Sequence, residues 1–258
     1  MSLHIKYLAL IENFSHTMHK RICKEGYKMI SHIISAVKRI GEMYSIWRMR
    51  KKTTEEIFGD IFKMNGWGSD ESISGPGSDL NQTRKIIAEL PLLLKELDIQ
   101  SILDIPCGDF NWMKFVDLHG LKYIGADIVS DLIEQNTKLY EKGDVRFQKI
   151  DLINDSLPEV DLIMVRDCFV HLSLSDIRNA LSNVCKSQAK YLLTTTFSDR
   201  RKNIDIATGQ WRTLNFEISP FFFPLPLKMI NEQCTECDGG YADKSLALWK
   251  IDDIRGLI

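Results

Sequence analysis

The sequence predicts an α/β fold: a doubly wound, mostly parallel seven-stranded sheet with helices on both faces, an antiparallel edge strand and an N-terminal helical extension. Two observations carry this prediction. After residue 100, short segments rich in Val, Ile, Leu and Tyr alternate with segments of helical periodicity, which is typical of a parallel sheet covered on both faces. Before residue 51, apolar residues recur instead at three- and four-residue spacing, which indicates helix.

The composition bounds the class of protein. With 44% hydrophobic and 26% charged residues, the chain is an ordinary globular one, which excludes a disordered or fibrous protein. The net charge of −2 hides an asymmetry, because residues 1–52 hold 11 Lys and Arg against 3 Glu, a local +8 that leaves −10 for the remainder. The six scattered cysteines follow no secretory signal, so we expect a cytoplasmic protein, and no apolar run is long enough for a transmembrane segment.

Residues 1–64 form the predicted basic N-terminal extension. A helix is expected over residues 3–50, with its apolar residues on one stripe and its basic residues between and after them. Two interpretations stay open: the apolar stripe packs on this chain's own domain or on a second chain, or the basic face of residues 1–52 contacts an anionic membrane surface or a nucleic acid.

The predicted catalytic domain spans residues 65–258 and begins with a Gly- and Ser-rich stretch. The segment NGWGSDESISGPGSD at 65–79 holds four glycines, a proline and four serines, which is loop chemistry. We expect residues 65–80 to form a loop or lid, with Trp67, Ser72, Gly75 and Ser78 over a bound ligand. A helix with an apolar side follows, up to about residue 97.

The elements after residue 100 are predicted in order from their composition. Five strands are expected at 101–105, 122–129, 145–151, 160–167 and 190–197, with the clearest helices at 130–140 and 173–187. A last pair of strands, 227–233 and 245–251, has no helix between its members. These two would most simply pair antiparallel at one edge of the sheet.

Acidic residues follow four of the predicted strands: Asp104 and Asp109, then Asp127, Asp151 and Asp167. In an open α/β sheet the ligand lies outside the carboxyl ends of the strands. Carboxylates gathered there repel one another and lose solvation, so a shared ligand that offers positive charge or hydrogen-bond donors is the economical explanation.

The loop after the first predicted strand indicates more closely which class of ligand binds. Asp127 lies about 20 residues beyond that loop, where nucleotide-binding folds place the acid that binds ribose hydroxyls. The loop itself has neither GxGxxG nor GxxxxGK[ST], and the acids on both sides of Gly108 would oppose a pyrophosphate. A nucleoside carrying positive charge is therefore favoured over a nicotinamide dinucleotide, which disfavours a dehydrogenase.

These segments, taken together and in this order, resemble the class I S-adenosylmethionine (SAM)-dependent methyltransferases. The resemblance rests on DIPCGDF, IGAD, the acid of QKIDL and VDLIMVRDCFVHLS, and covers about residues 83–251. One departure is Pro106, which stands where such proteins usually have a glycine and which offers no N–H to the donor. The resemblance implies SAM as cofactor, bound by these residues: Asp104, Cys107, Gly108, Asp109, Asp127, Ile128, Asp151, Leu152 and Arg166.

Within that implied site, each part of the donor has its own partners. Asp104 lies near the ammonium group of the methionine part, and Asp127 takes the ribose hydroxyls. Ile128 packs on the adenine, while Asp151 and the backbone of Leu152 meet its amino group. Arg166, together with Asp167 and His171, is expected to line the route from donor to acceptor.

The reaction needs a positioned acceptor and, for an alcohol, a base. His171 is the first candidate, because the pKa of its imidazole can be tuned near neutral, and Asp167 is the second. Each has a structural alternative: His171 as a helix-start residue bonded to a carbonyl, and Asp167 as the partner of Arg166.

The long segment 197–226 is the predicted acceptor pocket, because long loops in compact domains are usually functional. Its alternative is a surface loop whose aromatic residues seal the core. No metal is expected, since the CxxC of Cys234 and Cys237 lacks a second ligand pair. The predicted substrate-binding residues are Asp199, Asn203, Asp205, Trp211 and Arg212.

The predicted function is methyl transfer to a small polar acceptor, with a sugar or glycan hydroxyl favoured. The alternatives are an RNA or protein methyltransferase and a non-catalytic scaffold with the same fold. Nucleic acid is not expected on the active face, because the catalytic part carries −10.

Overall fold

The computed structural model describes Met49 and residues 51–258, and residues Lys52–Ile258 form one compact unit. The predicted N-terminal helix and its proposed contacts lie, but for Met49, outside the described residues. No helix among the described residues is both long and apolar enough to cross a membrane.

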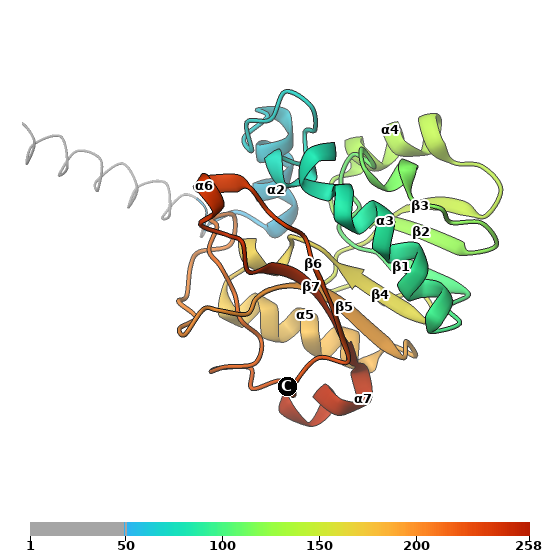
Figure 1. The fold of residues 1–258 in the computed structure, drawn as a ribbon. Coiled ribbons are helices and arrows are strands. Elements are labelled where there is room, and N and C mark those ends of the chain that lie inside the picture. Colours follow the sequence, from blue (N-terminus) through green and yellow to red (C-terminus); the bar gives the residue numbers. More distant parts are fainter. Residues whose placement is uncertain (1–48, 50) are drawn as a thin grey trace, which may run out of the picture. The chain divides into compact units, whose positions relative to one another are not determined.

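A seven-stranded sheet in the order β3-β2-β1-β4-β5-β7-β6 forms the centre of this unit (Figure 1). Strands β1 to β5 pair in parallel, and β7 pairs antiparallel with both β5 and β6. The predicted fold class, including the antiparallel pair at one edge, is confirmed. The strands are β1 Ser101–Asp104, β2 Lys122–Asp127, β3 Val145–Lys149, β4 Leu162–Val165, β5 Tyr191–Phe197, β6 Lys228–Asn231 and β7 Lys244–Lys250.

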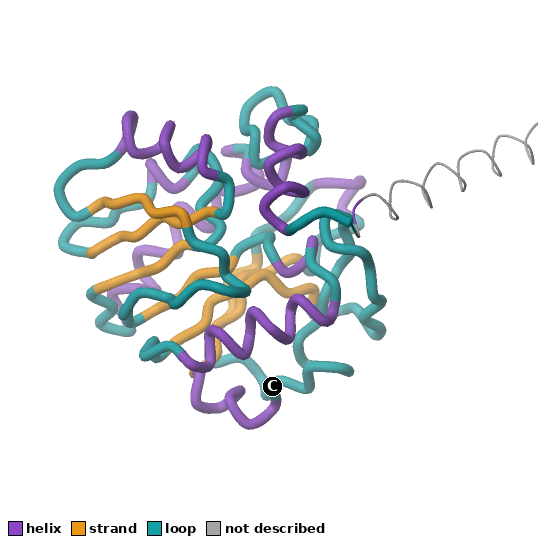
Figure 2. The backbone as a smooth tube through the Cα atoms, turned by 180° about the vertical axis from the view of Figure 1, so that it is seen from behind, coloured by secondary structure: helices purple, strands orange, loops and turns teal. Residues whose placement is uncertain are grey.

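Helices cover both faces of the sheet (Figure 2). One apolar core joins one face to α3 and α4, and the other joins the opposite face to α5 and α7. Successive residues of a strand alternate between the two cores: Ile102 belongs to the first and Leu103 to the second, as the two-residue period of a strand requires. The helices are α2 Thr54–Lys63, α3 Leu80–Glu96, α4 Ser130–Tyr140, α5 Leu174–Lys186, α6 Glu236–Gly239 and α7 Ile251–Ile254.

Helix α2 belongs to the compact unit, whereas the sequence-based boundary after residue 64 assigned it to the extension. Thr53 caps the helix: its hydroxyl accepts from the Glu56 N–H, and the Glu56 carboxylate accepts from the Thr53 N–H. Ile57 is buried and Phe58 packs against the core on the α5 side. This apolar side accounts for the earlier start of the unit.

The long segment after β5 packs into the core as well as reaching the surface. Phe221 and Phe223 are buried, and Phe223 lies with its ring centroid 5.4 Å from that of Trp249 on β7. The Trp249 indole N–H donates to the Pro224 carbonyl at 2.7 Å. This end of the segment therefore seals the core, as the alternative interpretation of its aromatic residues expected.

Candidate functional site

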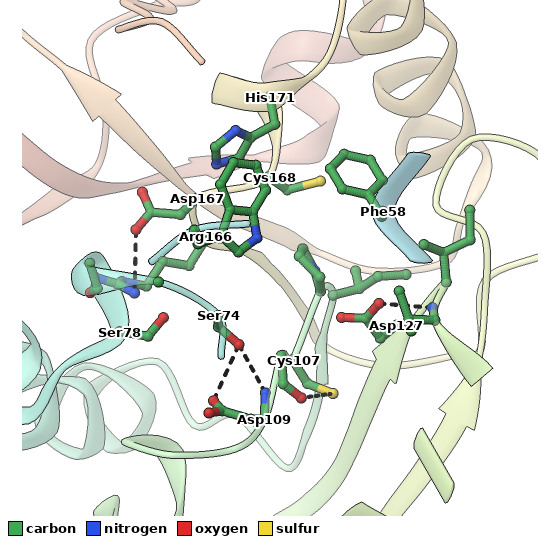
Figure 3. Close-up of a pocket in the computed structure, with 18 of the residues that line it drawn as sticks. Phe58, Ser74, Ser78, Cys107, Asp109, Asp127, Arg166, Asp167, Cys168 and His171 are labelled. Atoms are coloured by element: carbon green, nitrogen blue, oxygen red, sulfur yellow. Dashed lines mark hydrogen bonds and ion pairs between the residues drawn. The ribbon is translucent and has the colours of Figure 1, made fainter. Parts of the chain in front are cut away.

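A cavity of about 430 Å³ lies at the carboxyl ends of the parallel strands. Residues after β1, β2, β3 and β4 line it together with residues from α2, the Gly- and Ser-rich segment and the start of β7 (Figure 3). The structure thus brings together twelve of the residues predicted for the site: Asp104, Cys107, Gly108, Asp109, Asp127, Ile128, Asp151, Leu152, Arg166, Asp167, His171 and Trp211.

Asp104, the last residue of β1, is buried with 2% of its surface exposed. Its carboxylate accepts a 2.5 Å hydrogen bond from the Tyr123 hydroxyl on β2. Burial raises the pKa of Asp104 to about 7, although the bond from Tyr123 and the charge of Arg166 oppose the shift. A cation placed beside this carboxylate would be strongly attracted to it.

Asp127 ends β2 and is buried in the same cavity. Burial raises its pKa to about 6, although backbone N–H groups, among them that of Val129 at 3.0 Å, act in the opposite direction. The Asp151 carboxylate accepts from the Ile153 N–H at 2.8 Å and from the Asn154 amide at 2.7 Å, which shapes the loop after β3. Asp104 and Asp127 thus each have a carboxylate whose pKa is raised by burial.

The loop after β1 brings its backbone close to the cavity. Gly108 has φ +55°, a conformation that favours glycine, and a Cβ there would collide with the Ser74 hydroxyl. The Asn136 amide of α4 donates to the Gly108 carbonyl at 2.7 Å, which fixes the loop from its other side. Burial holds the pKa of the Cys107 thiol well above its ordinary range, so the thiol stays neutral.

Asp109 also lines the cavity, but its carboxylate is engaged by the Gly- and Ser-rich segment. It accepts from the Ser72 hydroxyl at 2.9 Å, the Ile73 N–H at 3.0 Å and the Ser74 hydroxyl at 3.2 Å. The contacts described for this carboxylate therefore hold the segment and the loop after β1 together (Figure 3).

A network of four charged side chains lies at the end of β4. Arg166 binds Glu232 through Nη2 at 2.7 Å, and Lys244 binds Asp167 at 2.6 Å and Glu232 at 3.3 Å. Burial alone would raise the pKa of Asp167, but the nearby charges of Lys244 and Arg166 lower it to about 2. The Asp167 carboxylate is therefore ionised and paired, in agreement with its structural alternative.

His171 follows β4 in a short 3₁₀ turn and lines the cavity. Its Nδ1 lies 3.0 Å from the Gln210 carbonyl, which only accepts, so Nδ1 carries the proton and Nε2 carries the lone pair. The Trp67 ring packs against it with centroids 4.2 Å apart. Burial lowers the pKa of His171 to about 4, so the imidazole is neutral at physiological pH.

An aromatic wall completes the cavity beyond His171. Trp211 lies with its ring centroid 5.0 Å from that of Tyr241, and Phe197 packs edge-on against both. All three residues line the cavity, and Trp211 is 43% exposed at its rim. The wall offers apolar ring surface next to the charged pair of Asp167 and Lys244.

The other four predicted substrate residues lie outside the described lining of the cavity. Arg212 donates to the Phe169 and Leu172 carbonyls at 2.6 and 2.7 Å, and Asn203 donates to the Asn215 and Ser219 carbonyls. Asp205 accepts from the Leu174 N–H at the start of α5, and Asp199 is exposed. Arg212, Asn203 and Asp205 hold the segment 197–226 in place, since their partners are backbone groups.

Sequence reasoning missed Lys244, Glu232 and Tyr241. Lys244 could have been found from the predicted antiparallel strand. Such a strand begins where its parallel neighbours end, so the first residue of β7 lies at the cavity. Glu232 lies in the predicted strand 227–233, directly after the observed end of β6, and Tyr241 lies in the connection to β7, and neither carries a pattern that marks a site. Within the described part of the chain, no group of three or more metal-ligating side chains occurs.

Comparison with known proteins identifies the fold. No protein-family model and no curated protein matches the sequence. The structure is similar to N-methyltransferase NodS from Bradyrhizobium japonicum WM9 in complex with S-adenosylhomocysteine (SAH), with a TM-score of 0.55 and 17% identity over 74% of this chain and 97% of that one. It is also similar to human N-acetylserotonin methyltransferase in complex with SAM, with a TM-score of 0.54 and 15% identity over 78% of this chain and 60% of that one, so it spans less than two thirds of the human enzyme. The chain has the fold of class I SAM-dependent methyltransferases.

Proposed function

We propose that the protein is a SAM-dependent methyltransferase that methylates a small polar acceptor, with a sugar or glycan hydroxyl as the favoured class. The observation that carries the proposal is the pair Asp104 and Asp127. Two carboxylates with raised pKa values end neighbouring strands of this fold and face one cavity. A ligand with an ammonium group and a ribose diol relieves the cost of burying both charges.

The lining of the cavity fits the donor in other respects. Ile128, Leu132 and Leu152 offer apolar surface next to Asp127, where an adenine would pack. The glycine at 108 lets the backbone approach the cavity without a side chain. When bound, SAM supplies an electrophilic methyl group on a sulfonium sulfur.

His171 is the residue that we assign as the proton acceptor. Its Nδ1 is held by the Gln210 carbonyl, so the lone pair of Nε2 is available. Burial keeps the ring neutral with a pKa of about 4, below the near-neutral value expected from the sequence, so the position of Nε2 rather than its basicity supports this role. Asp167 is a weaker candidate because Lys244 and Arg166 hold it as a paired anion. We therefore propose that Asp167 positions the charged network and that His171 accepts the hydroxyl proton.

The acceptor would bind between the aromatic wall and the network of charges. A sugar presents an apolar face of C–H groups to a ring and hydroxyls around its edge. Trp211 and Tyr241 supply the rings, while Lys244 and Glu236 line the same cavity and supply hydrogen-bonding groups. A polyanion is disfavoured by the net −10 of residues 53–258.

The donor site is tested by isothermal titration with SAM and SAH on the intact chain and on Asp104→Asn and Asp127→Asn. We expect each variant to weaken SAM binding by roughly 10- to 150-fold, because charge-assisted hydrogen bonds contribute about 1.5–3 kcal/mol each. Asp253→Asn, an exposed aspartate of α7, is the matched control and should bind as the wild type does. An intact chain that binds neither compound would remove the enzyme proposal and leave the scaffold alternative.

The acceptor is tested by transfer of a labelled methyl group to nucleotide sugars, oligosaccharides, RNA and peptides. With an accepted sugar, Trp211→Ala should mainly raise KM, since it removes a binding surface, and His171→Gln should mainly lower kcat. Methylation of RNA or peptide but of no sugar would reject the favoured acceptor class while keeping the reaction.

A further inference from the structure

The Gly- and Ser-rich segment covers the cavity. We call residues 67–78 the lid segment; Trp67 and the run from Ile73 to Ser78 line the cavity. The strands carry the acids, whereas the lid segment precedes the sheet in sequence, and its Ser74 meets Asp109 beside the cavity (Figure 3). What holds this segment in place therefore decides access to the acids.

Asp109 holds the lid segment on the side of β1. Its carboxylate accepts from two hydroxyls and one backbone N–H of residues 72–74, and the Asp109 N–H donates to the Ser74 hydroxyl at 3.0 Å. Ser72 is buried, with 2% of its surface exposed. Such a cluster of hydrogen bonds to one carboxylate is a strong anchor, because bonds to an ionised acceptor are about twice as strong as neutral ones.

Gly108 shows how closely the two loops meet. A Cβ at this position would collide with the Ser74 hydroxyl, so glycine is required by the lid segment as well as by its own φ of +55°. The loop after β1 is thus shaped to receive the lid segment.

Both ends of the lid segment make further contacts. Arg166 Nη2 donates to the Gly77 carbonyl at 2.7 Å, and the Asn111 amide donates to the Ser78 carbonyl at 3.3 Å. The Trp67 ring packs on the His171 imidazole. The lid segment therefore contacts Arg166 of the charged network and His171, the proposed proton acceptor.

We propose that Asp109 is a positioning residue that holds the lid segment closed over the cavity, and that it acts on the lid segment rather than as a ligand of the donor. This inference rests on the proposed function for the nature of the ligand. Its consequence is kinetic: the bonds of Asp109 must break for donor or product to exchange, so weakening them speeds release of the product SAH.

The first test is hydrogen exchange in the lid segment, which needs no ligand. In Asp109→Asn the Ile73 amide, which donates directly to the carboxylate, should exchange at least about tenfold faster, while amides of β1 and β4 keep their rates. Asp70→Asn, an exposed aspartate of the same segment, should exchange as the wild type does. Unchanged exchange at Ile73 in Asp109→Asn would overturn the inference.

The second test is the rate of SAH release, followed by stopped flow through intrinsic tryptophan fluorescence, since Trp67, Trp112 and Trp211 all line the cavity. We expect release about tenfold faster in Asp109→Asn and in the double variant Ser72→Ala/Ser74→Ala, with melting temperatures near that of the wild type. Combining all three changes should add little, because residues of one hydrogen-bond cluster are not additive. Faster hydrogen exchange with an unchanged rate of SAH release would overturn the positioning role. If the intact chain did not bind SAH, the proposed function would be rejected, and hydrogen exchange at Ile73 would still decide whether Asp109 holds the lid segment.

Discussion

Asp104 and Asp167 follow neighbouring strands and line one cavity, yet their pKa values are shifted in opposite directions. Asp104 has a single hydroxyl partner among the side-chain contacts described, and burial raises its pKa to about 7. Asp167 lies beside Lys244 and Arg166, which lower its pKa to about 2 against the effect of burial. An ionised aspartate is thus unfavourable at the end of β1, where burial dominates, and favourable after β4, where two cations lie beside it.

The two halves of the cavity therefore differ in whether the protein itself compensates their negative charge. The half at β1 and β2 carries negative charge whose desolvation is only partly offset by the protein, which suits a ligand that brings positive charge. The half at β4 and β7 balances its own charges in the network of Arg166, Glu232, Lys244 and Asp167. A neutral acceptor fits there without changing that balance.

The largest loss of stability is expected from removing the positive charge of Lys244 at the start of β7. Lys244→Met leaves the buried Glu232 and the partly buried Asp167 with Arg166 as their remaining cation, so we expect the free energy of unfolding to fall by about 3 kcal/mol. Urea denaturation at pH 7 measures it.

Lys250→Met is the matched control, because Lys250 lies on the same strand with its side chain exposed, and its cost should stay below about 0.5 kcal/mol. Adding Asp167→Asn to Lys244→Met should recover part of the loss. A Lys244→Met variant as stable as the wild type would show that the network does not compensate Asp167.

An effect of opposite sign is expected at β1. The pKa of Asp104 is about 7 in the folded protein against 3.8 for the free side chain, so the folded state binds more protons between these values and stability falls as pH rises from about 4 to 7. Asp104→Asn removes this loss and should stabilise the ligand-free protein by about 2–4 kcal/mol at pH 8, with little change at pH 4.

Urea denaturation of both proteins at the two pH values measures the difference. Asp253→Asn should show no such pH-dependent gain, since its side chain is exposed. If Asp104→Asn were destabilising at pH 8, the carboxylate would be compensated in the folded protein and the contrast with Asp167 would disappear.

The sheet and the half of the cavity at β1 and β2 were predictable because local patterns determine them. Strands β1, β2 and β4 have apolar residues, and an acid at or just after the end of each marks where these parallel strands end. Asp104 and Asp127 therefore follow from the sequence together with one rule of topology. The resemblance to class I methyltransferases rested on these segments, and the fold confirms it at the level of architecture.

The half of the cavity at β4 and β7 was harder to predict because its residues meet only through tertiary contacts. Arg212 and Asn203 have the polar character of binding residues, yet they donate to backbone carbonyls of their own surroundings. Lys244 reaches the cavity from 77 residues beyond its partner Asp167, a pairing that no local pattern indicates. A polar residue in a long loop is thus weaker evidence for a site than an acid at the end of a strand.

The smallest expected effect sharpens the comparison through the pH dependence of donor binding. Because Asp104 and Asp127 have pKa values of about 7 and 6, a ligand that binds their ionised forms must displace protons in mild acid. We expect SAM affinity to fall by roughly tenfold or more between pH 7.5 and 5.5, measured by isothermal titration. Asp167, with a pKa of about 2, stays ionised over this range and contributes nothing to the slope. Since the two raised pKa values generate the slope, an affinity that is flat across this interval would mean that the donor does not meet these carboxylates as anions, while Asp253→Asn should retain the wild-type slope.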